Sequence, residues 1–235
     1  MKNKNIVLIP AYEPEDKLIK LVDTLTKEDF DIVIVDDGSG NDYQDIFHKC
    51  QNKAYVISYN QNKGKGHALK TGLKYIKEKY KKDYIIVTMD CDGQHTIKDA
   101  KKLIKECSKN KDTVYLGKRI RCEKTPLRSR LGNAITRLVY KVVVGLDIYD
   151  TQTGLRAFSD NLTDYMLSIE GERFEYEMNV LLNCAIDKIK LKEITIETIY
   201  IDNNSKTHFN GIKDSYRIYK DIIEFALTHK KKRKK

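Results

Sequence analysis

Short apolar segments alternate with amphipathic segments along the first half of the chain. The apolar segments cover residues 6–10, 31–37, 55–59, 84–90 and 113–119, and helical periodicity occupies the stretch from about residue 15 and residues 42–49, 64–79 and 97–108. Buried strands that alternate with helices are typical of a parallel sheet covered on both faces. The pattern predicts an α/β fold with a Rossmann-like, mostly parallel sheet flanked by helices.

The alternation weakens after residue 125. There the sequence predicts a basic helix over residues 127–145, a polar loop over 150–158, a helix over 175–186, an alternating strand over 189–201 and a terminal basic helix over 211–227. We find no repeat and no interdomain linker, and 235 residues suit one α/β domain. The whole chain, residues 1–235, is therefore expected to form a single domain.

Composition narrows the class of protein. With 40% hydrophobic and 33% charged residues the chain resembles a folded soluble protein, and no apolar stretch approaches the ~20 residues that a membrane span needs. The first apolar run is too short for a signal peptide. The five cysteines, Cys50, Cys91, Cys107, Cys122 and Cys184, are scattered without metal-type spacing, which indicates reduced thiols and a cytoplasmic location.

Positive charge is concentrated at the C-terminus. The net charge is +10, and the last six residues are all Lys or Arg. Such a tail binds nucleic acid or an anionic membrane surface, or remains a solvated end. The segment before it places Tyr216, Tyr219, Ile223 and Leu227 at helical spacing, a stripe that fits either membrane contact or core packing.

A short motif that contains polar residues stands at the end of each predicted strand of the first half. Ligands of open α/β sheets bind outside the carboxyl ends of the strands. The residues in question are Pro10, Ala11, Tyr12 and Glu13, then D-D-G-S at 36–39, N-K-G-K-G at 62–66, D-C-D-G-Q-H at 90–95 and G-K-R at 117–119. We expect all five groups to face one crevice.

Asp90 and Asp92 stand one residue apart after a buried strand. Their mutual repulsion calls for a cation, and Mg²⁺ typically takes one or two carboxylates together with substrate phosphates. Gln94 could add a carbonyl oxygen, and His95 a nitrogen better suited to Mn²⁺. The alternative is an acidic surface turn.

Other strand-end residues suit phosphate and nucleoside. Lys65 and Gly66 begin a helix, where free N–H groups favour an anion, although the spacing is not that of a P-loop and no G-x-G-x-x-G follows the first strand. Asp36 suits a turn cap and Asp37 a hydrogen bond to a base or ribose. The planar donors Arg119, Arg128, Arg130 and Arg156 suit phosphate, with a solvated position more typical for Arg128.

With these motifs the sequence resembles the inverting family 2 glycosyltransferases of the GT-A fold, and among them the polyprenyl-phosphate sugar synthases related to dolichyl-phosphate mannose synthase. The resemblance rests on the strand-end motifs above and on S-R-L-G-N, D-T-Q-T-G-L-R-A-F and S-K-T-H-F, in the order of the family. It implies sugar transfer from a UDP- or GDP-linked sugar to undecaprenyl or dolichyl phosphate at the cytosolic membrane face. Residues 1–120 would then bind the nucleotide sugar, residues 121–228 the acceptor, and residues 229–235 would form the tail.

The resemblance also implies roles for single residues. Asp90, Asp92 and Gln94 would bind Mg²⁺ or Mn²⁺. The nucleotide sugar would contact Pro10, Ala11, Tyr12, Glu13, Asp37, Lys65, Gly66, Asp90, Cys91, Asp92, Arg119 and Lys206. Asp92, Arg119, Arg130 and Arg156 would serve catalysis, the last two on the acceptor side.

Two departures from the family stand out. Many relatives carry an acidic residue where this chain has Pro14, so that Glu13 would replace it, and many have transmembrane helices after the catalytic domain. Any flippase-type membrane partner would be a separate protein, and the basic C-terminus would attach the enzyme peripherally to the anionic membrane rather than to nucleic acid.

Two other functions remain open. The first is transfer to a sugar hydroxyl of a cell-surface glycan or teichoic-type polymer, which needs a general base, with Glu175 and Glu177 as candidates. The second is a non-catalytic nucleotide or nucleic-acid binding protein, which the basic tail favours and the aspartate pair disfavours.

Overall fold

The computed structural model describes residues 3–120 and 127–197 together with residues 214, 217–220 and 222. Seven strands form one sheet in the order β3-β2-β1-β4-β6-β5-β7. The strands are β1 (Lys4–Ala11), β2 (Asp31–Asp36), β3 (Tyr55–Ser58), β4 (Tyr84–Thr88), β5 (Thr113–Arg119), β6 (Arg156–Ser159) and β7 (Lys190–Ile196). The helices are α1 (Lys17–Leu25), α2 (Gln44–Gln51), α3 (Lys65–Tyr80), α4 (Ile97–Cys107), α5 (Leu127–Val144), α6 (Thr163–Ser168) and α7 (Glu175–Ile186), with 3₁₀ turns η1 (Asn41–Tyr43) and η2 (Asp160–Leu162).

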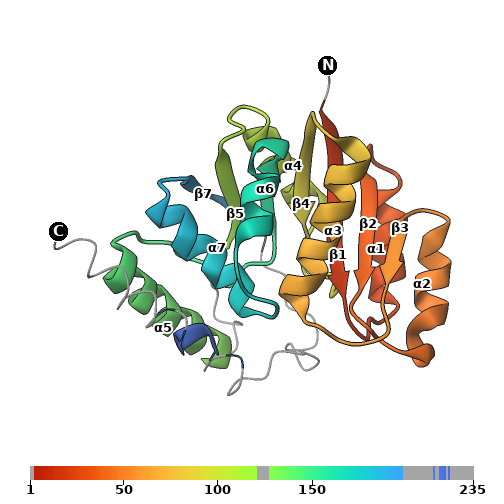
Figure 1. The fold of residues 1–235 in the computed structure, drawn as a ribbon, viewed down its shortest axis with the longest axis horizontal. Coiled ribbons are helices and arrows are strands. Elements are labelled where there is room, and N and C mark those ends of the chain that lie inside the picture. The colour runs from red at the N-terminus through yellow and green to blue at the C-terminus, as the bar shows by residue number, and fades with distance from the viewer. Residues whose placement is uncertain (1–2, 121–126, 198–213, 215–216, 221, 223–235) are drawn as a thin grey trace.

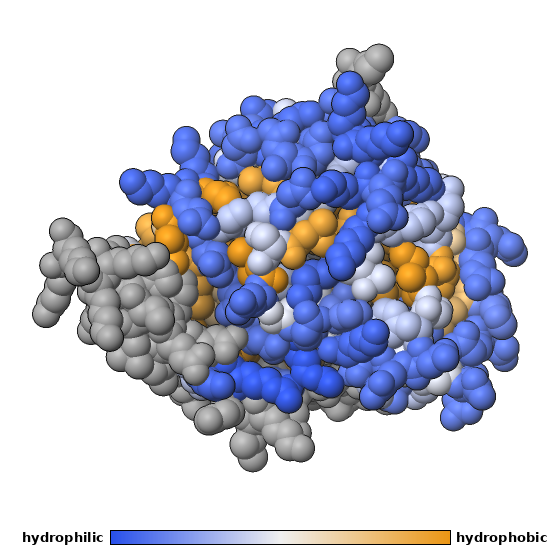
Figure 2. Space-filling model, in the orientation of Figure 1, coloured by the Kyte–Doolittle hydropathy of each residue, from blue (hydrophilic) through white to orange (hydrophobic). Residues whose placement is uncertain are grey.

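Alternate residues of the central strands enter two separate cores, because successive side chains of a strand point to opposite faces. Ile6 and Leu8 of β1 pack with α3, α6 and α7, whereas Val7 and Ile9 pack with α1, α2 and α4. Figure 1 looks onto the face that α3, α6 and α7 cover, and α5 lies at the margin of the molecule. Figure 2 shows that hydrophilic residues dominate this face, with hydrophobic ones visible between them. The predicted α/β sandwich with a mostly parallel sheet is confirmed.

The polar loop predicted over residues 150–158 is wrong at its C-terminal end. Arg156–Ser159 forms β6, which lies between β4 and β5 and runs antiparallel to both. All four residues of β6 are buried, although two of them, Arg156 and Ser159, are polar, so its sequence shows neither an apolar run nor an alternation. Because β6 separates two mutually parallel strands, its first residue, Arg156, lies at the edge where β4 and β5 end.

The other predicted elements of the second half have mixed outcomes. The helices at 127–145 and 175–186 appear as α5 and α7, and the alternating strand begins as β7, which pairs parallel with β5. The C-terminal end of that strand, most of the helix predicted at 211–227 and the basic tail lie outside the described residues. Within the described part, no helix is both long and apolar enough to cross a bilayer.

Candidate active site

The candidate site lies at the carboxyl edge of the sheet. The strands β1, β2, β4 and β5 all end at this edge and β6 begins there, because β6 pairs Arg156 with both Thr88 and Leu116. The hydroxyl of Thr88 donates to the carbonyl of Gly154 at 2.8 Å, which ties the segment before β6 to the end of β4. The sheet thus brings together motifs that lie far apart in the sequence.

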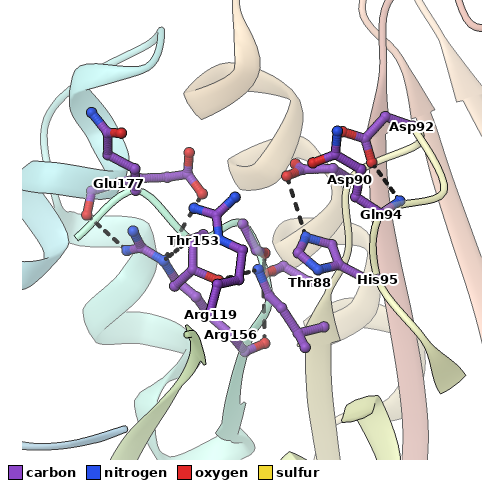
Figure 3. Close-up of polar contacts among 12 residues, drawn as sticks. Thr88, Asp90, Asp92, Gln94, His95, Arg119, Thr153, Arg156 and Glu177 are labelled. Carbon is purple, nitrogen blue, oxygen red and sulfur yellow. Dashed lines mark hydrogen bonds and ion pairs between the residues drawn. The ribbon is translucent and has the colours of Figure 1, made fainter. Parts of the chain in front are cut away.

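Asp90 and Asp92 follow β4 and lie on one side of the site, with Arg119, Arg156 and Glu177 on the other (Figure 3). The backbone N–H of Gln94 donates to Oδ1 of Asp92 at 2.9 Å, so this carboxylate also organises the turn. Burial and the neighbouring charge of Asp90 raise the pKa of Asp92. A buried carboxylate beside a second carboxylate favours a cation nearby.

Asp90 already has two cationic or potentially cationic neighbours. Nζ of Lys65 lies 2.8 Å from its Oδ1, and Nε2 of His95 lies 3.5 Å from its Oδ2. Burial alone would raise the pKa of Asp90, but Lys65 and His95 outweigh burial and hold it well below its usual range. Gly154 packs so closely on this carboxylate that an added Cβ would lie 2.1 Å from Oδ2.

Lys65 links the two halves of the chain. Its ammonium lies 2.8 Å from Oε2 of Glu177 as well as from Asp90. Burial lowers the pKa of Lys65, but the two carboxylates raise it more, so that the ammonium stays charged. Nε of Arg156 in turn lies 3.9 Å from Oε1 of Glu177, and its Nη1 donates to the carbonyl of Glu177 at 2.7 Å.

Arg156 is nearly inaccessible to solvent. Its side chain is 6% exposed, its Nε donates to the carbonyl of Thr153 at 3.1 Å, and its Nη2 is buried with no hydrogen-bond partner among the described residues. Nδ1 of His95 is also buried and has no hydrogen-bond partner among the described residues. Buried polar atoms without a hydrogen-bond partner are rare in folded proteins, and here they mark the surroundings of Asp90 and Glu177 as a place suited to a polar ligand.

Arg119 at the end of β5 is held by Asp150. Its Nε and Nη2 donate to the two oxygens of that carboxylate at 2.7 and 3.0 Å. The backbone N–H of Asp150 donates to Glu193 of β7, and the side chain of Asn133 on α5 donates to the carbonyl of Tyr149. These bonds fix the loop before β6 and orient the guanidinium of Arg119.

The motif at the end of β2 shapes the loop before α3. Asp37 is 3% exposed, and its carboxylate accepts hydrogen bonds from the hydroxyl of Tyr59 at 2.6 Å and from the backbone N–H groups of Lys63 and Gly64 at 2.9 and 2.8 Å. Gly64 has φ +106°, a conformation that favours glycine, and an added Cβ would lie 2.5 Å from the carbonyl oxygen of Glu172. A contact between Asp37 and a nucleoside remains a prediction.

The other predicted nucleotide contacts lie at the same edge. Pro10 and Ala11 end β1 and are buried, Tyr12 and Glu13 are partly buried, and the backbone N–H of Glu13 donates to Oγ of Ser39 at 2.8 Å. Gly66 lies in the first turn of α3, and Cys91 lies partly buried between the two aspartates. Arg130 belongs to α5, but its side chain, like all of Lys206, lies outside the described part of the chain.

The donor set near Asp90 fits a divalent cation that takes oxygen ligands. Asp90 and Asp92 supply carboxylates, and Gln94 lies beside them. In the described part of the chain no three His, Cys, Asp or Glu side chains gather as a metal site. A cation here would complete its shell with substrate oxygens or water, as Mg²⁺ commonly does.

Sequence reasoning missed several residues of this site. It placed Glu177 only as a candidate base, and it assigned no role to Asp150, Asn133 or Gly154. Three of these stand inside quoted motifs, S-R-L-G-N and D-T-Q-T-G-L-R-A-F, so motif membership was the available signal. Their partners are separated from them by 16 to 66 residues, and no periodicity reveals such pairs.

Comparison with known proteins gives the class. Glycosyl transferase family 2 matches residues 6–169. The chain is 30% identical over 229 residues to an uncharacterised protein of Methanocaldococcus jannaschii, covering 95% of this chain and 93% of that protein. It is also 30% identical over 236 residues to the UDP-N-acetylglucosamine–dolichyl-phosphate N-acetylglucosaminyltransferase of Methanococcus voltae, covering 90% and 93%. A solved structure of glucosyl-3-phosphoglycerate synthase from Mycobacterium tuberculosis with Mn²⁺, UDP and product superposes with a TM-score of 0.65 at 18% identity, over 96% of this chain and 79% of that one.

The fold is that of a GT-A glycosyltransferase. The chain belongs to glycosyltransferase family 2, and it is an enzyme of that class.

Proposed function

We propose that this enzyme transfers a sugar from a nucleotide diphosphate sugar to a polyprenyl phosphate. The observation that carries the proposal is the pairing of an acidic cation site at Asp90 and Asp92 with the buried guanidinium of Arg156 across the same edge of the sheet. The names of the similar proteins support this acceptor: that of Methanococcus voltae acts on dolichyl phosphate, and a Saccharomyces cerevisiae protein, 27% identical over 95% of this chain and 74% of its own length, is a dolichyl-phosphate beta-glucosyltransferase.

The charges at the site suit departure of a nucleotide diphosphate. A divalent cation held by Asp90, Asp92 and Gln94 would neutralise the diphosphate, and the Mn²⁺ bound with UDP by the mycobacterial structural neighbour supports this choice of group. Lys65 begins α3, where free N–H groups add to its own positive charge. The oxygen ligands of Asp90, Asp92 and Gln94 suit either Mg²⁺ or Mn²⁺.

The acidic residues beside the site are arranged for structure rather than for proton removal. Oε2 of Glu177 lies 2.8 Å from the ammonium of Lys65, which occupies one of the two carboxylate oxygens. Glu175 accepts the backbone N–H groups of Glu172 and Arg173 at 3.1 and 3.0 Å, so it shapes the loop before α7. A phosphate acceptor is already an anion near neutral pH and requires no base. This supports the phosphate acceptor over the sugar hydroxyl.

A membrane-bound acceptor requires a surface that meets the bilayer, and α5 supplies candidate residues. Leu138 and Val142 are 62% and 76% exposed, one helical turn apart, and Leu146 just beyond the helix is 45% exposed. Residues 127–146 include Arg128, Arg130, Arg137 and Lys141 and no acidic residue. Exposed apolar side chains on a basic helix suit the interface of an anionic membrane. Peripheral attachment at the cytosolic face, with the basic tail as a second contact, is part of the proposal.

A product assay tests the proposed function. The full chain is incubated with a panel of radiolabelled UDP- and GDP-sugars, a divalent cation and extracted membrane lipid, and the label is partitioned between organic solvent and water. The proposal predicts label in the organic phase. Label in an aqueous polymer would instead indicate a glycan hydroxyl acceptor, and unchanged nucleotide sugar with every donor would indicate a binding protein. The same panel identifies the sugar and the nucleotide.

A further inference from the structure

Four side chains of alternating charge connect the cation site to the acceptor half of the chain. Asp90 follows β4, Lys65 begins α3, Glu177 lies in α7 and Arg156 begins β6. The contacts run from Asp90 to Lys65 at 2.8 Å, from Lys65 to Glu177 at 2.8 Å, and from Glu177 to Arg156 at 3.9 Å. The side chain of Lys65 is 16% exposed, so its two ion pairs are only weakly screened by water.

The carboxylate of Asp90 has no oxygen free of neighbours. The ammonium of Lys65 contacts Oδ1, while Nε2 of His95 and the backbone at Gly154 crowd Oδ2. A divalent cation binds a carboxylate oxygen at about 2.0 to 2.2 Å, well inside the present distance between Oδ1 and the ammonium. Both cations cannot keep full contact with Oδ1, because their mutual repulsion is strong in a partly buried site.

We propose that Lys65 is the resident counter-cation of Asp90, which a divalent cation must displace. The displaced ammonium keeps its contact with Glu177 and pairs with the anion that arrives together with the cation. This second part rests on the proposed function, in which that anion is a nucleotide diphosphate. Lys65 is therefore a positioning residue that makes divalent cation and nucleotide bind cooperatively.

The effect of Lys65 on cation binding changes sign when nucleotide is present. In the absence of nucleotide, Lys65 competes with the divalent cation and weakens its binding. In the presence of nucleotide, Lys65 stabilises the bound anion and strengthens the whole complex. Because coupling between two ligands is reciprocal, the cation must improve nucleotide affinity by the same factor as the nucleotide improves cation affinity.

The test is a calorimetric titration of the full chain with Mn²⁺, first without nucleotide and then in the presence of UDP or GDP. Lys65→Met is expected to tighten binding of Mn²⁺ alone by about fivefold or more, within the usual range of coupling between sites, and to reduce the gain that nucleotide brings. Lys63→Met is the matched control: it removes the same charge two residues away, from a lysine whose ammonium lies 5.3 Å from the centre of the Tyr59 ring. Its affinity for Mn²⁺ should stay within about twofold of the wild-type value.

Glu177→Gln is a second variant, and its expected effect on the affinity for Mn²⁺ is opposite to that of Lys65→Met. This substitution neutralises one of the two carboxylates that pair with Lys65, so the ammonium should pair more strongly with Asp90. Mn²⁺ alone should therefore bind more weakly than it does to the wild-type chain. This variant decides the question if Lys65→Met fails to fold by circular dichroism.

Unchanged or weaker Mn²⁺ binding in folded Lys65→Met, or unchanged or tighter binding in Glu177→Gln, would overturn the inference and leave the proposed function standing. A wild-type chain that binds neither UDP nor GDP in the presence of Mn²⁺ would contradict the proposed function, while the titrations without nucleotide would still decide whether Lys65 is the counter-cation of Asp90.

Discussion

At the scale of single residues, the two aspartates of the site differ in how their surroundings treat a negative charge. Asp90 is held by Lys65 and His95, whereas Asp92 has a raised pKa because burial and Asp90 disfavour its charge. This asymmetry indicates that Asp92 is the carboxylate whose charge gains most from an added cation. The aspartate pair could be predicted from the sequence, because its spacing after a buried strand is unusual. Lys65 and Glu177 were named from the sequence in other roles, but their ion pairs could not be predicted, because these contacts depend on how α3 and α7 pack.

Asp92→Asn should lower turnover by at least about 10²-fold, the typical cost of losing one important electrostatic contact in a transition state. The side chain keeps its shape, so the hydrogen bond from the backbone of Gln94 and the fold should persist. Product formation at saturating nucleotide sugar measures the effect, with circular dichroism as the check on folding. Near-normal turnover in a folded variant would show that the assignment of Asp92 is wrong.

At the scale of elements, one buried carboxylate joins α4 to β7. Asp99 accepts hydrogen bonds from Thr96 at 2.7 Å, from Lys102 at 2.7 Å and from the backbone N–H of Glu197 at 3.1 Å. Thr96 caps the helix by accepting from the backbone N–H of Asp99. The sequence predicts α4 and β7 separately from their periodicities, but it does not show that Asp99 connects them.

The pH dependence of stability should reflect this junction. Burial raises the pKa of Asp99, but its hydrogen bonds with Lys102, Thr96 and Glu197 lower it more, so its pKa in the folded chain lies below the usual value. A lowered pKa stabilises the fold above the unfolded-state pKa of about 3.9, and this stability is lost as the pH falls through the folded-state value.

Asp99→Asn should therefore lower the free energy of unfolding by about 1.5 to 3 kcal/mol at neutral pH, the usual contribution of hydrogen bonds to a charged group. The difference from the wild-type chain should shrink below about pH 4. Urea unfolding at several pH values measures both effects, with Glu78→Gln on the exposed surface of α3 as control. An equal loss at neutral and acidic pH would show that the charge of Asp99 does not contribute.

At the scale of the whole molecule, hydrophobic periodicity predicts most of the architecture. The long strands and helices agree within a few residues with the predicted ranges, because each has enough positions to show its period. The strand β6 was missed because its four residues, all buried, begin with Arg156 and end with Ser159, so that the segment looks like part of a polar loop. That strand reverses direction inside the sheet and carries Arg156 to the site, so a short element with no readable period determines how the two halves meet.

Membrane attachment should depend on α5 and on the tail. Replacing Leu138 and Val142 together by serine should reduce sedimentation with anionic vesicles, because two exposed apolar side chains of the helix would be lost from the interface.

A chain ending at Thr228 should lose further binding that is sensitive to salt, since each basic residue near an anionic leaflet contributes about 1 kcal/mol.

Tyr55→Ser is the matched control for the α5 variant. Tyr55 is 48% exposed and lies on β3, at the far edge of the sheet from β7. Its replacement should leave vesicle binding unchanged. Equal sedimentation of the wild-type, α5 and shortened chains at low salt would exclude both surfaces as membrane contacts.

The central claim is that the acceptor is a phosphate oxygen of a lipid. The most direct measurement offers the enzyme two short, water-soluble prenyl acceptors of the same chain length, one with a terminal phosphate and one with a terminal hydroxyl, together with the nucleotide sugar that the donor panel selects and a divalent cation. Mass spectrometry of the products then identifies the glycosylated acceptor. The account predicts a prenyl-phosphate sugar, its loss in Asp92→Asn, and no product from the alcohol. Transfer to the alcohol, or to neither acceptor while the same donor glycosylates a sugar hydroxyl, would contradict it.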